Sequence, residues 1–210
     1  EQTIKNTSEL QFQQEFECEF LGSSNTLIRA SVLRRLVPIT ALQENEHLKV
    51  YALPDKTRQY AMVVDTSHGL GNDYSAGIIF DITTTPYTIA AVYRNNDIPP
   101  MLLPDVVFNL GKQYNYCPIL VETNDIGQQV ADILYHDLEY ENLIFGTQNE
   151  RDGQIISGGF AGRRMHYGVR TNKQVKRIGC ANLKNIIESD KLIIQDYNLI
   201  YELSRFIAVR

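Results

Sequence analysis

The chain has 210 residues, of which 43% are hydrophobic and 21% charged, and its 20 Lys and Arg against 25 Asp and Glu give a formal net charge of −5. This composition is typical of a globular protein with a substantial core, and its acidity argues against a protein that coats nucleic acid irrespective of sequence, while leaving room for a local basic groove. The three cysteines, Cys18, Cys117 and Cys180, are far apart and form no CxxC pair, so neither a disulfide framework nor a zinc site is indicated. The sequence has no apolar run of about 18 residues and no signal-peptide core, so we expect a soluble, cytoplasmic protein that does not contact membranes.

The first fifty residues are expected to form an entry segment that packs on the core of the domain. A helix is expected over Thr7–Phe20, where apolar residues recur at near-helical spacing. A short basic helix is expected over Ala30–Val37, ending before Pro38 because proline disfavours the helical conformation of the residue that precedes it. Leu48–Leu53 indicates a strand. We interpret this segment as the tail of a preceding domain.

The centre of the chain predicts three consecutive strands. Tyr60–Thr66 begins with a short apolar run, which is typical of a strand buried on both faces. A glycine-rich turn separates it from a second strand over Ala76–Thr83, and a third strand is expected over Tyr87–Tyr93. Because the connection Thr84–Pro86 is short, the second and third strands should pair antiparallel.

After the third strand, helical and strand patterns alternate. A helix over Pro104–Tyr114 has proline in its first turn, a position that helices favour. The apolar run Cys117–Glu122 predicts a buried strand, and the helical crossover before it favours parallel pairing with the first strand. Asp125–Tyr135 shows helical spacing, and either Thr123 or Asn124 is expected to cap this helix.

The C-terminal third contains a long polar loop between regular elements. We expect a strand at Leu143–Phe145, a glycine-rich loop at Gly146–Thr171, a helix at Asn172–Ser189, a strand at Leu192–Gln195 and a helix at Tyr197–Phe206. A loop of this length inside a compact domain is usually functional or mobile. The complete order predicts an α/β fold with a mixed sheet and helices on both of its faces.

Three acidic residues flank the predicted carboxyl edge of this sheet. Asp65 stands where the first strand ends, Asp73 closes the glycine-rich turn, and Glu122 ends the parallel strand. Open α/β sheets bind their ligands at this edge, and carboxylate oxygens are ligands that Mg²⁺ takes in proteins. The acids therefore indicate a divalent-cation site, with turn capping and helix capping as the ordinary alternatives.

Basic residues gather in the long loop and on the helix that follows it. The candidate DNA-binding residues are Arg163, Arg164, Arg170, Lys173, Lys176 and Arg177. A local concentration of positive charge in an acidic chain indicates contact with phosphate groups, which proteins bind irrespective of base sequence. An ordinary solvated surface is the alternative interpretation.

The order of elements resembles the RNase H-like nuclease and integrase fold, in which a three-strand meander is followed by a helix and a parallel strand. Several long stretches are also similar to the C-terminal nuclease domain of the T4-type tailed-bacteriophage large terminase. These stretches are QFQQEFECEFLGSSNTLI at Gln11–Ile28, VDTSHGLGNDYSA at Val64–Ala76, LPDVVF at Leu103–Phe108, YNYCPILVETNDIGQQVA at Tyr114–Ala131, YHDLEYE at Tyr135–Glu141 and IGCANLKNIIESDKLII at Ile178–Ile194. Because they are collinear over nearly the whole chain, the resemblance is more specific than any single motif.

The resemblance implies a metal-dependent endonuclease that cuts concatemeric double-stranded viral DNA when genome packaging starts and ends. It implies Mg²⁺ as the cofactor, with Mn²⁺ as a substitute, and assigns catalysis and metal binding to Asp65 and Glu122, with Asp73 as a secondary ligand. His68 stands where relatives carry an acid, and we assign it no role. The implied partners are double-stranded DNA, the portal protein, the small terminase subunit and an ATPase domain of the same polypeptide. The implied location is the host cytoplasm, transiently at the procapsid portal vertex.

On this resemblance, residues 1–45 are a linker from the preceding ATPase domain and residues 46–210 are the nuclease domain. The sequence contains no GxxxxGK[ST] phosphate-binding loop, so the ATPase is expected elsewhere in the polypeptide. The stretch also stops before the family's third catalytic aspartate, and Asp196 falls too early to be that residue. We therefore expect this stretch to bind one metal ion at most and to have little nuclease activity by itself.

Two other functions remain open from the sequence. A junction-resolvase-like nuclease would share only the fold, whereas a non-catalytic module that grips DNA and docks to the portal would use the acids structurally. The collinear stretches favour the terminase nuclease over the resolvase. Cleavage of plasmid DNA with Mg²⁺ or Mn²⁺ would separate the nuclease from the docking module.

Overall fold

A computed structural model of the chain describes residues 26–147 and 165–207. These residues fall into two compact units, one made of residues 26–39 and 183–207 and the other of residues 40–182. The helix expected over Thr7–Phe20 and the candidate DNA-binding residues Arg163 and Arg164 lie outside the described residues. Among the helices that are described, none combines the length and the apolar character needed to span a bilayer.

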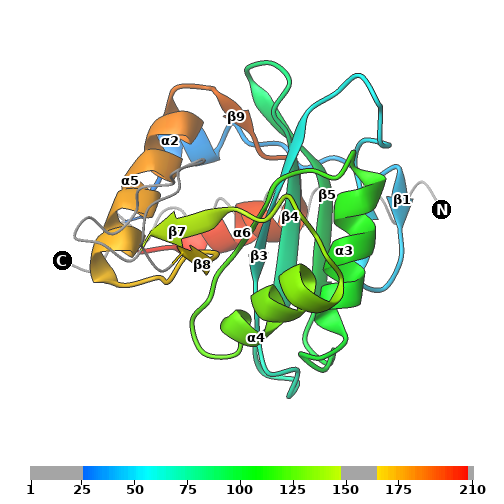
Figure 1. Cartoon of the computed structure of the whole chain (residues 1–210). Helices are drawn as coiled ribbons and strands as arrows, with labels where there is room; N and C mark the ends of the chain where they lie inside the picture. The colour runs from blue at the N-terminus through cyan, green and yellow to red at the C-terminus, as the bar shows by residue number, and fades with distance from the viewer. Residues whose placement is uncertain (1–25, 148–164, 208–210) are drawn as a thin grey trace. The chain divides into compact units, whose positions relative to one another are not determined.

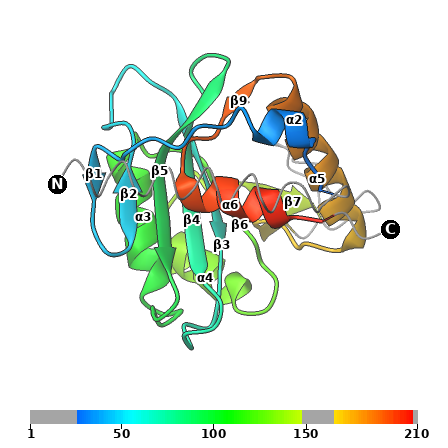
Figure 2. The ribbon, with the colours of Figure 1, turned by 180° about the vertical axis from the view of Figure 1, so that it is seen from behind.

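The larger unit is built on a mixed sheet with the strand order β1-β2-β5-β4-β3-β6 (Figure 1 and Figure 2). The central strands β3 (Tyr60–Asp65), β4 (Ser75–Asp81) and β5 (Tyr87–Asn95) pair antiparallel in the order of the chain. For β4 and β5 this confirms the pairing predicted from the short connection between them. The strand β6 (Ile119–Val121) pairs parallel to β3, so that Val121 lies opposite Val64. The parallel pairing expected from the helical crossover is therefore confirmed.

A two-stranded addition extends the sheet beyond β5 (Figure 2). Strand β2 (Leu48–Val50) pairs antiparallel with β5 and is shorter than expected, while β1 (Gln43–Glu44) was not predicted. Both residues of β1 are exposed, so the apolar alternation by which strands are recognised in a sequence is missing here.

The helices α3 (Leu103–Gln113) and α4 (Gly127–Asp132) cover one face of the sheet (Figure 1). The core lies between that face and the helices, and it includes Met62, Val64, Ile79, Tyr93 and Val121 of the sheet together with Val107 of α3 and Val130 of α4. Burial along β3 alternates, since Val64 is fully buried while Val63 is 43% exposed. The expectation that β3 is buried on both faces is therefore wrong, because this strand belongs to an antiparallel hairpin whose faces differ.

The segment after β6 departs from the prediction. The helix expected over Asp125–Tyr135 is instead the short α4 followed by a π-helical turn, η1 (Ile133–Asp137). Neither expected capping residue acts as one, because α4 starts without a side-chain cap and Asn124 pairs with the backbone of Thr171. The strand expected at Leu143–Phe145 is shifted to β7 (Phe145–Thr147), which pairs with β8 (Met165–Tyr167).

The smaller unit contains α2 (Ala30–Leu33), β9 (Leu192–Ile193), α6 (Tyr197–Arg205) and the last part of α5 (Lys173–Glu188). The helix expected over Ala30–Val37 is thus reduced to a single turn. Glu188 joins these segments, because its carboxylate lies 2.9 Å from the Arg29 guanidinium and 3.0 Å from the Lys184 ammonium. Asp196 is fully buried and caps α6 by accepting a hydrogen bond from Leu199 N–H at 2.9 Å, which is a structural role.

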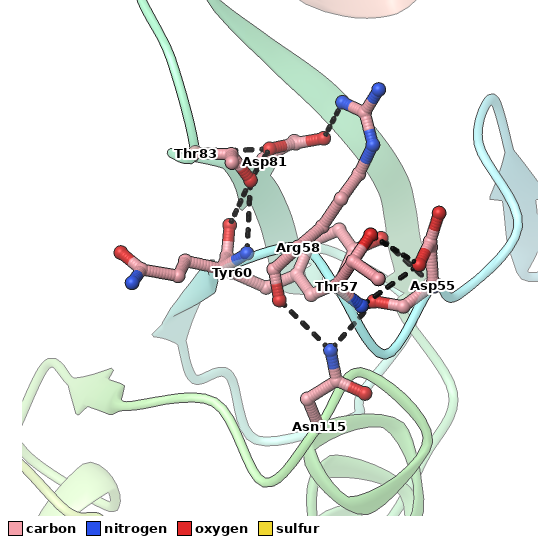
Figure 3. Close-up of polar contacts among 8 residues, drawn as sticks. Asp55, Thr57, Arg58, Tyr60, Asp81, Thr83 and Asn115 are labelled. Atoms are coloured by element: carbon pink, nitrogen blue, oxygen red, sulfur yellow. Dashed lines mark hydrogen bonds and ion pairs between the residues drawn. The ribbon is translucent and has the colours of Figure 1, made fainter.

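A second buried aspartate closes one end of the β3–β4 hairpin (Figure 3). Asp81, only 4% exposed, accepts hydrogen bonds from Thr83 N at 3.0 Å and Thr83 Oγ1 at 2.6 Å, and its other oxygen lies 2.5 Å from Arg58 Nη1. Burial raises the pKa of this carboxyl, but the hydrogen bonds from Thr83 and Arg58 outweigh burial and hold the pKa below its ordinary value. Asn115 donates from its side chain to the carbonyls of Asp55 and Arg58, which ties this corner to the end of α3.

Candidate metal and nucleic-acid site

The parallel pairing of β3 with β6 brings two carboxylates together at the end of the sheet. Asp65 is the last residue of β3, and Glu122 follows β6 directly, with its N–H donating to Val64 O at 2.8 Å. Because Val121 lies opposite Val64, the next residue on each strand shares a row and a face. The side chains of Asp65 and Glu122 are within hydrogen-bonding reach of each other.

The electrostatics of this pair are unfavourable for two ionised acids. Burial, then the hydrogen bond to Glu122 and the negative charge of Glu122, raise the pKa of Asp65 to about 6. The negative charge of Asp73 also raises the pKa of Asp65. The hydrogen bond that Asp65 accepts from Thr66 N–H at 2.9 Å acts in the opposite direction and lowers this pKa. The pair therefore holds negative charge that the surrounding protein compensates poorly.

The glycine-rich loop after β3 is held in one shape by its own hydrogen bonds. Ser67 N–H donates to Ser75 Oγ at 3.0 Å, and Ser67 Oγ donates to the carbonyl of Asp73 at 2.9 Å, which fixes the backbone that carries this acid. Gly69 has a φ of 66°, and a Cβ there would collide with the carbonyl of Ile98. A glycine is required at this position both for the conformation and for the close approach.

Two loops meet beside the carboxylate pair. A Cβ at Gly127 would collide with the carbonyl of Glu122 and press against Thr66 Oγ1, so only glycine allows the start of α4 to pack this closely. On the surface, His68 Nε2 lies 2.5 Å from Asp125 Oδ2, which connects the glycine-rich loop to the segment after β6. The sequence predicts no role for either residue, because nothing local indicates that positions 57 residues apart meet.

One of the candidate DNA-binding residues lies next to the pair. The segment after β8 runs parallel to the end of β6, with Glu122 opposite Val169, and Asn124 exchanges two hydrogen bonds of 2.8 Å with the backbone of Thr171. Arg170 lies between these two anchor points and is exposed. The structure thus fixes the backbone of Arg170 beside the carboxylate edge.

The other described basic candidates lie on the first turns of α5. Lys173, Lys176 and Arg177 are all exposed, and Asn172 caps the helix by accepting from the N–H groups of Gln174 and Val175. The side chains of these residues are thus available to solvent, as a phosphate-binding role requires.

The donor set fits a hard divalent cation. Asp65 and Glu122 provide carboxylate oxygens close together, and Asp73 contributes charge nearby. A cation would compensate the charge that raises the pKa of Asp65. Within residues 26–147 and 165–207, no group of three or more His, Cys, Asp or Glu side chains is placed to hold a metal.

Comparisons with known proteins identify the family to which this fold belongs. The family model of the terminase RNaseH-like domain matches residues 62–208. The large terminase nuclease of thermophilic phage G20c with bound cobalt is similar in structure, with a TM-score of 0.67 and 18% identity over 90% of this chain and 84% of that one. The same nuclease with bound magnesium gives a TM-score of 0.67 and 17% identity with the same coverage.

The large terminase nuclease domain of Thermus phage P74-26 gives a TM-score of 0.63 and 18% identity, covering 89% of this chain and 80% of that one. At such identities the likeness shows the fold alone. That fold is the RNase H-like mixed α/β fold expected from the order of strands and helices.

Proposed function

The chain belongs to the family of terminase RNaseH-like domains, and we propose that it is the metal-dependent endonuclease domain that cuts concatemeric double-stranded viral DNA when genome packaging starts and ends. The observation that carries this proposal is the contact between Asp65 and Glu122 at the carboxyl edge of the sheet. A structural pair of acids would be expected to have its own compensating donors, as Asp81 does.

We propose that Asp65 and Glu122 hold Mg²⁺, for which Mn²⁺ can substitute, with Asp73 as a secondary ligand. The G20c nuclease, whose fold is the same, has been solved with magnesium and with cobalt, which supports a divalent ion here. When bound, such an ion supplies an activated water and stabilises the leaving oxygen of the phosphodiester.

The chain's own residues position these groups. Asp65 sits on the end of a strand paired on both sides, so its backbone is rigid, and the bonds of Ser67 fix the backbone of Asp73. Pre-organisation of this kind matters because a catalytic group displaced by about 1 Å can lose about a hundredfold in rate.

The substrate is proposed to be double-stranded DNA, bound through its phosphates. Arg170 lies beside Glu122, and Lys173, Lys176 and Arg177 continue the exposed positive charge along α5. Contacts of this kind fix the register of the duplex but do not read its bases. Arg163 and Arg164 are proposed to belong to the same phosphate-binding region on sequence grounds.

In a packaging machine this domain would work together with an ATPase domain of the same polypeptide, the portal protein and the small terminase subunit. We propose that it acts in the host cytoplasm, transiently at the portal vertex of the procapsid. A pull-down of the intact protein with purified portal would test the docking part of this proposal separately from catalysis.

The test of the nuclease function is plasmid cleavage by the intact protein with Mg²⁺ or Mn²⁺, compared with EDTA. Asp65→Asn and Glu122→Gln keep the shape of each side chain and remove its charge, so both should abolish cleavage while the protein stays folded. Asp105→Asn, which changes an exposed acid in the first turn of α3, is the matched control and should cut normally.

The alternatives give different results in the same assay. A DNA-gripping module without catalysis would bind plasmid but not cut it under any metal condition, and neither Asp65→Asn nor Glu122→Gln would change its behaviour. A junction-resolvase-like nuclease would prefer four-way junctions to linear duplex. Cleavage of linear duplex that depends on both acids would support the terminase function.

A further inference from the structure

We propose that Arg94 binds a backbone phosphate of the DNA immediately beside the Asp65–Glu122 pair, on the side opposite Arg170. This inference rests on the proposed nuclease function and deepens it by assigning a phosphate-binding residue on β5. Neither the basic loop nor α5 contains this residue, and no short motif in the sequence points to it.

The sheet places Arg94 in one row with the two acids. Ala76 on β4 lies opposite Asp65 on one side and opposite Arg94 on the other. Residues paired across strands point to the same face of a sheet, so Arg94 and Asp65 share the face opposite the one that α3 and α4 cover. Glu122 continues the row beyond Asp65.

A β-bulge produces this arrangement. From Asp81 to Phe80 the pairing follows the register set by the turn, but between Phe80 and Ile79 it shifts by one residue and leaves Ala90 of β5 without an opposite residue. Without this shift Tyr93 would lie opposite Ala76, and Arg94 would point to the other face of the sheet. The reason is that a change of one residue in strand pairing moves every side chain of the strand to the opposite face. The bulge thus directs the cation towards the acids and the tyrosine into the core, where Tyr93 is found.

The distance along the row suits a second phosphate contact. Arg94 and Asp65 are two strand spacings apart, which is about 10 Å between backbones, and the residue between them is alanine, whose small side chain leaves the row open. Two like-charged acids repel DNA, and a cation within about one Debye length compensates this repulsion. On the other side of the acids the residue opposite Glu122 is Val169, and Arg170 follows it one position later, so Arg94 is the cation that strand pairing places in the row of the acids.

The guanidinium of Arg94 is held in place by Tyr74. Its central carbon lies 3.8 Å from the centre of the Tyr74 ring, in a cation–π contact. Stacking uses the flat face of the guanidinium, and arginine binds phosphate oxygens in pairs through the N–H groups at the edge of that plane. Tyr74 adjoins Asp73, so the loop that carries the third acid also orients the arginine.

The experiment measures DNA binding without cleavage, by fluorescence anisotropy of a labelled duplex with the intact Asp65→Asn protein in EDTA. Arg94→Gln in this background should weaken binding about five- to tenfold and reduce the slope of log K against log salt by about one. Lys112→Gln removes the same charge from an exposed position on α3, which covers the other face of the sheet. This control should change neither quantity.

The role of Tyr74 is tested in the same assay. Tyr74→Phe keeps the ring and should bind DNA as the parent does, while Tyr74→Leu removes the ring and should lose two- to fivefold in affinity. Equal affinities and salt slopes for Arg94→Gln and Lys112→Gln would overturn the assignment of Arg94, whatever Asp65→Asn does to cleavage. Persistent cleavage by Asp65→Asn would instead overturn the proposed function, and a parent protein that binds no duplex would overturn both.

Discussion

The β3–β4 hairpin carries an aspartate at each end, and the protein shifts the pKa values of these two aspartates in opposite directions. Asp81, beside the start of β3, is buried and receives donors from Thr83 and Arg58, so its pKa is held below the ordinary value. Asp65, at the end of β3, accepts from Thr66 N–H but faces Glu122, and its pKa rises to about 6.

The difference separates an acid with a structural role from one that we propose to bind a metal ion. A carboxylate whose charge is matched inside the protein contributes to stability and has little capacity left for a ligand. A carboxylate placed against another acid costs stability, and such an arrangement persists where an external cation compensates it. The two ends of one hairpin therefore differ in what stabilises their charge, the protein itself or a ligand.

The same substitution at the two ends of the hairpin should have very different effects on DNA cleavage. Asp65→Asn should reduce plasmid cleavage by at least about a hundredfold, because losing a metal ligand removes several kcal/mol of transition-state stabilisation. Asp81→Asn should leave cleavage within a few-fold of the parent wherever the protein is folded. Equal losses in the two variants would show that Asp65 has no special role.

For stability the larger effect should come from the change at Asp81, and the smaller effect from the change at Asp65. Asp81→Ala leaves Arg58 and both donors of Thr83 without their acceptor, so the free energy of unfolding should fall by about 2–3 kcal/mol, or about 5–10 °C in Tm. Asp65→Ala removes a repulsive contact and should leave Tm unchanged or slightly raised. Thermal unfolding followed by circular dichroism measures both, and a larger loss at Asp65 would contradict the comparison.

Metal binding should stabilise only through the Asp65 end. Mg²⁺ at about ten times its Kd should add about 1.4 kcal/mol to the unfolding free energy, seen as a rise of a few degrees in Tm. This rise should vanish in Asp65→Asn and in Glu122→Gln. It should persist in Asp81→Ala, so an equal metal response in all variants would place the cation elsewhere.

The smallest expected effect is a pH dependence of the Asp81 end. Because the pKa of Asp81 in the folded protein lies below 3.8, its charge contributes stability above about pH 4, and this contribution is lost as the pH falls through the folded-state pKa. The gap in unfolding free energy between the parent and Asp81→Asn, measured with urea, should therefore shrink from pH 5 to pH 2. Glu46→Gln, at a side chain 87% exposed, should show no comparable change.

The sequence alone determined the central part of the sheet. Apolar runs, short turns and one helical crossover were enough to predict β3, β4, β5, α3 and the parallel strand β6. They also placed Asp65 and Glu122 at one edge, because the carboxyl ends of neighbouring parallel strands must coincide. These signals are local, because each helix or strand is indicated by the spacing of its own hydrophobic residues.

The tertiary structure alone decided which distant residues meet. Asn124 looked like a helix cap but binds Thr171, and His68 reaches Asp125 across two loops. The bulge at Ala90 sets which face of the sheet Arg94 joins, and a shift of one residue in pairing leaves no trace in hydrophobic periodicity. The periodicity of hydrophobic residues shows which side of a helix or strand is apolar. Strand register, bulges and loop contacts depend instead on packing between segments far apart in the chain.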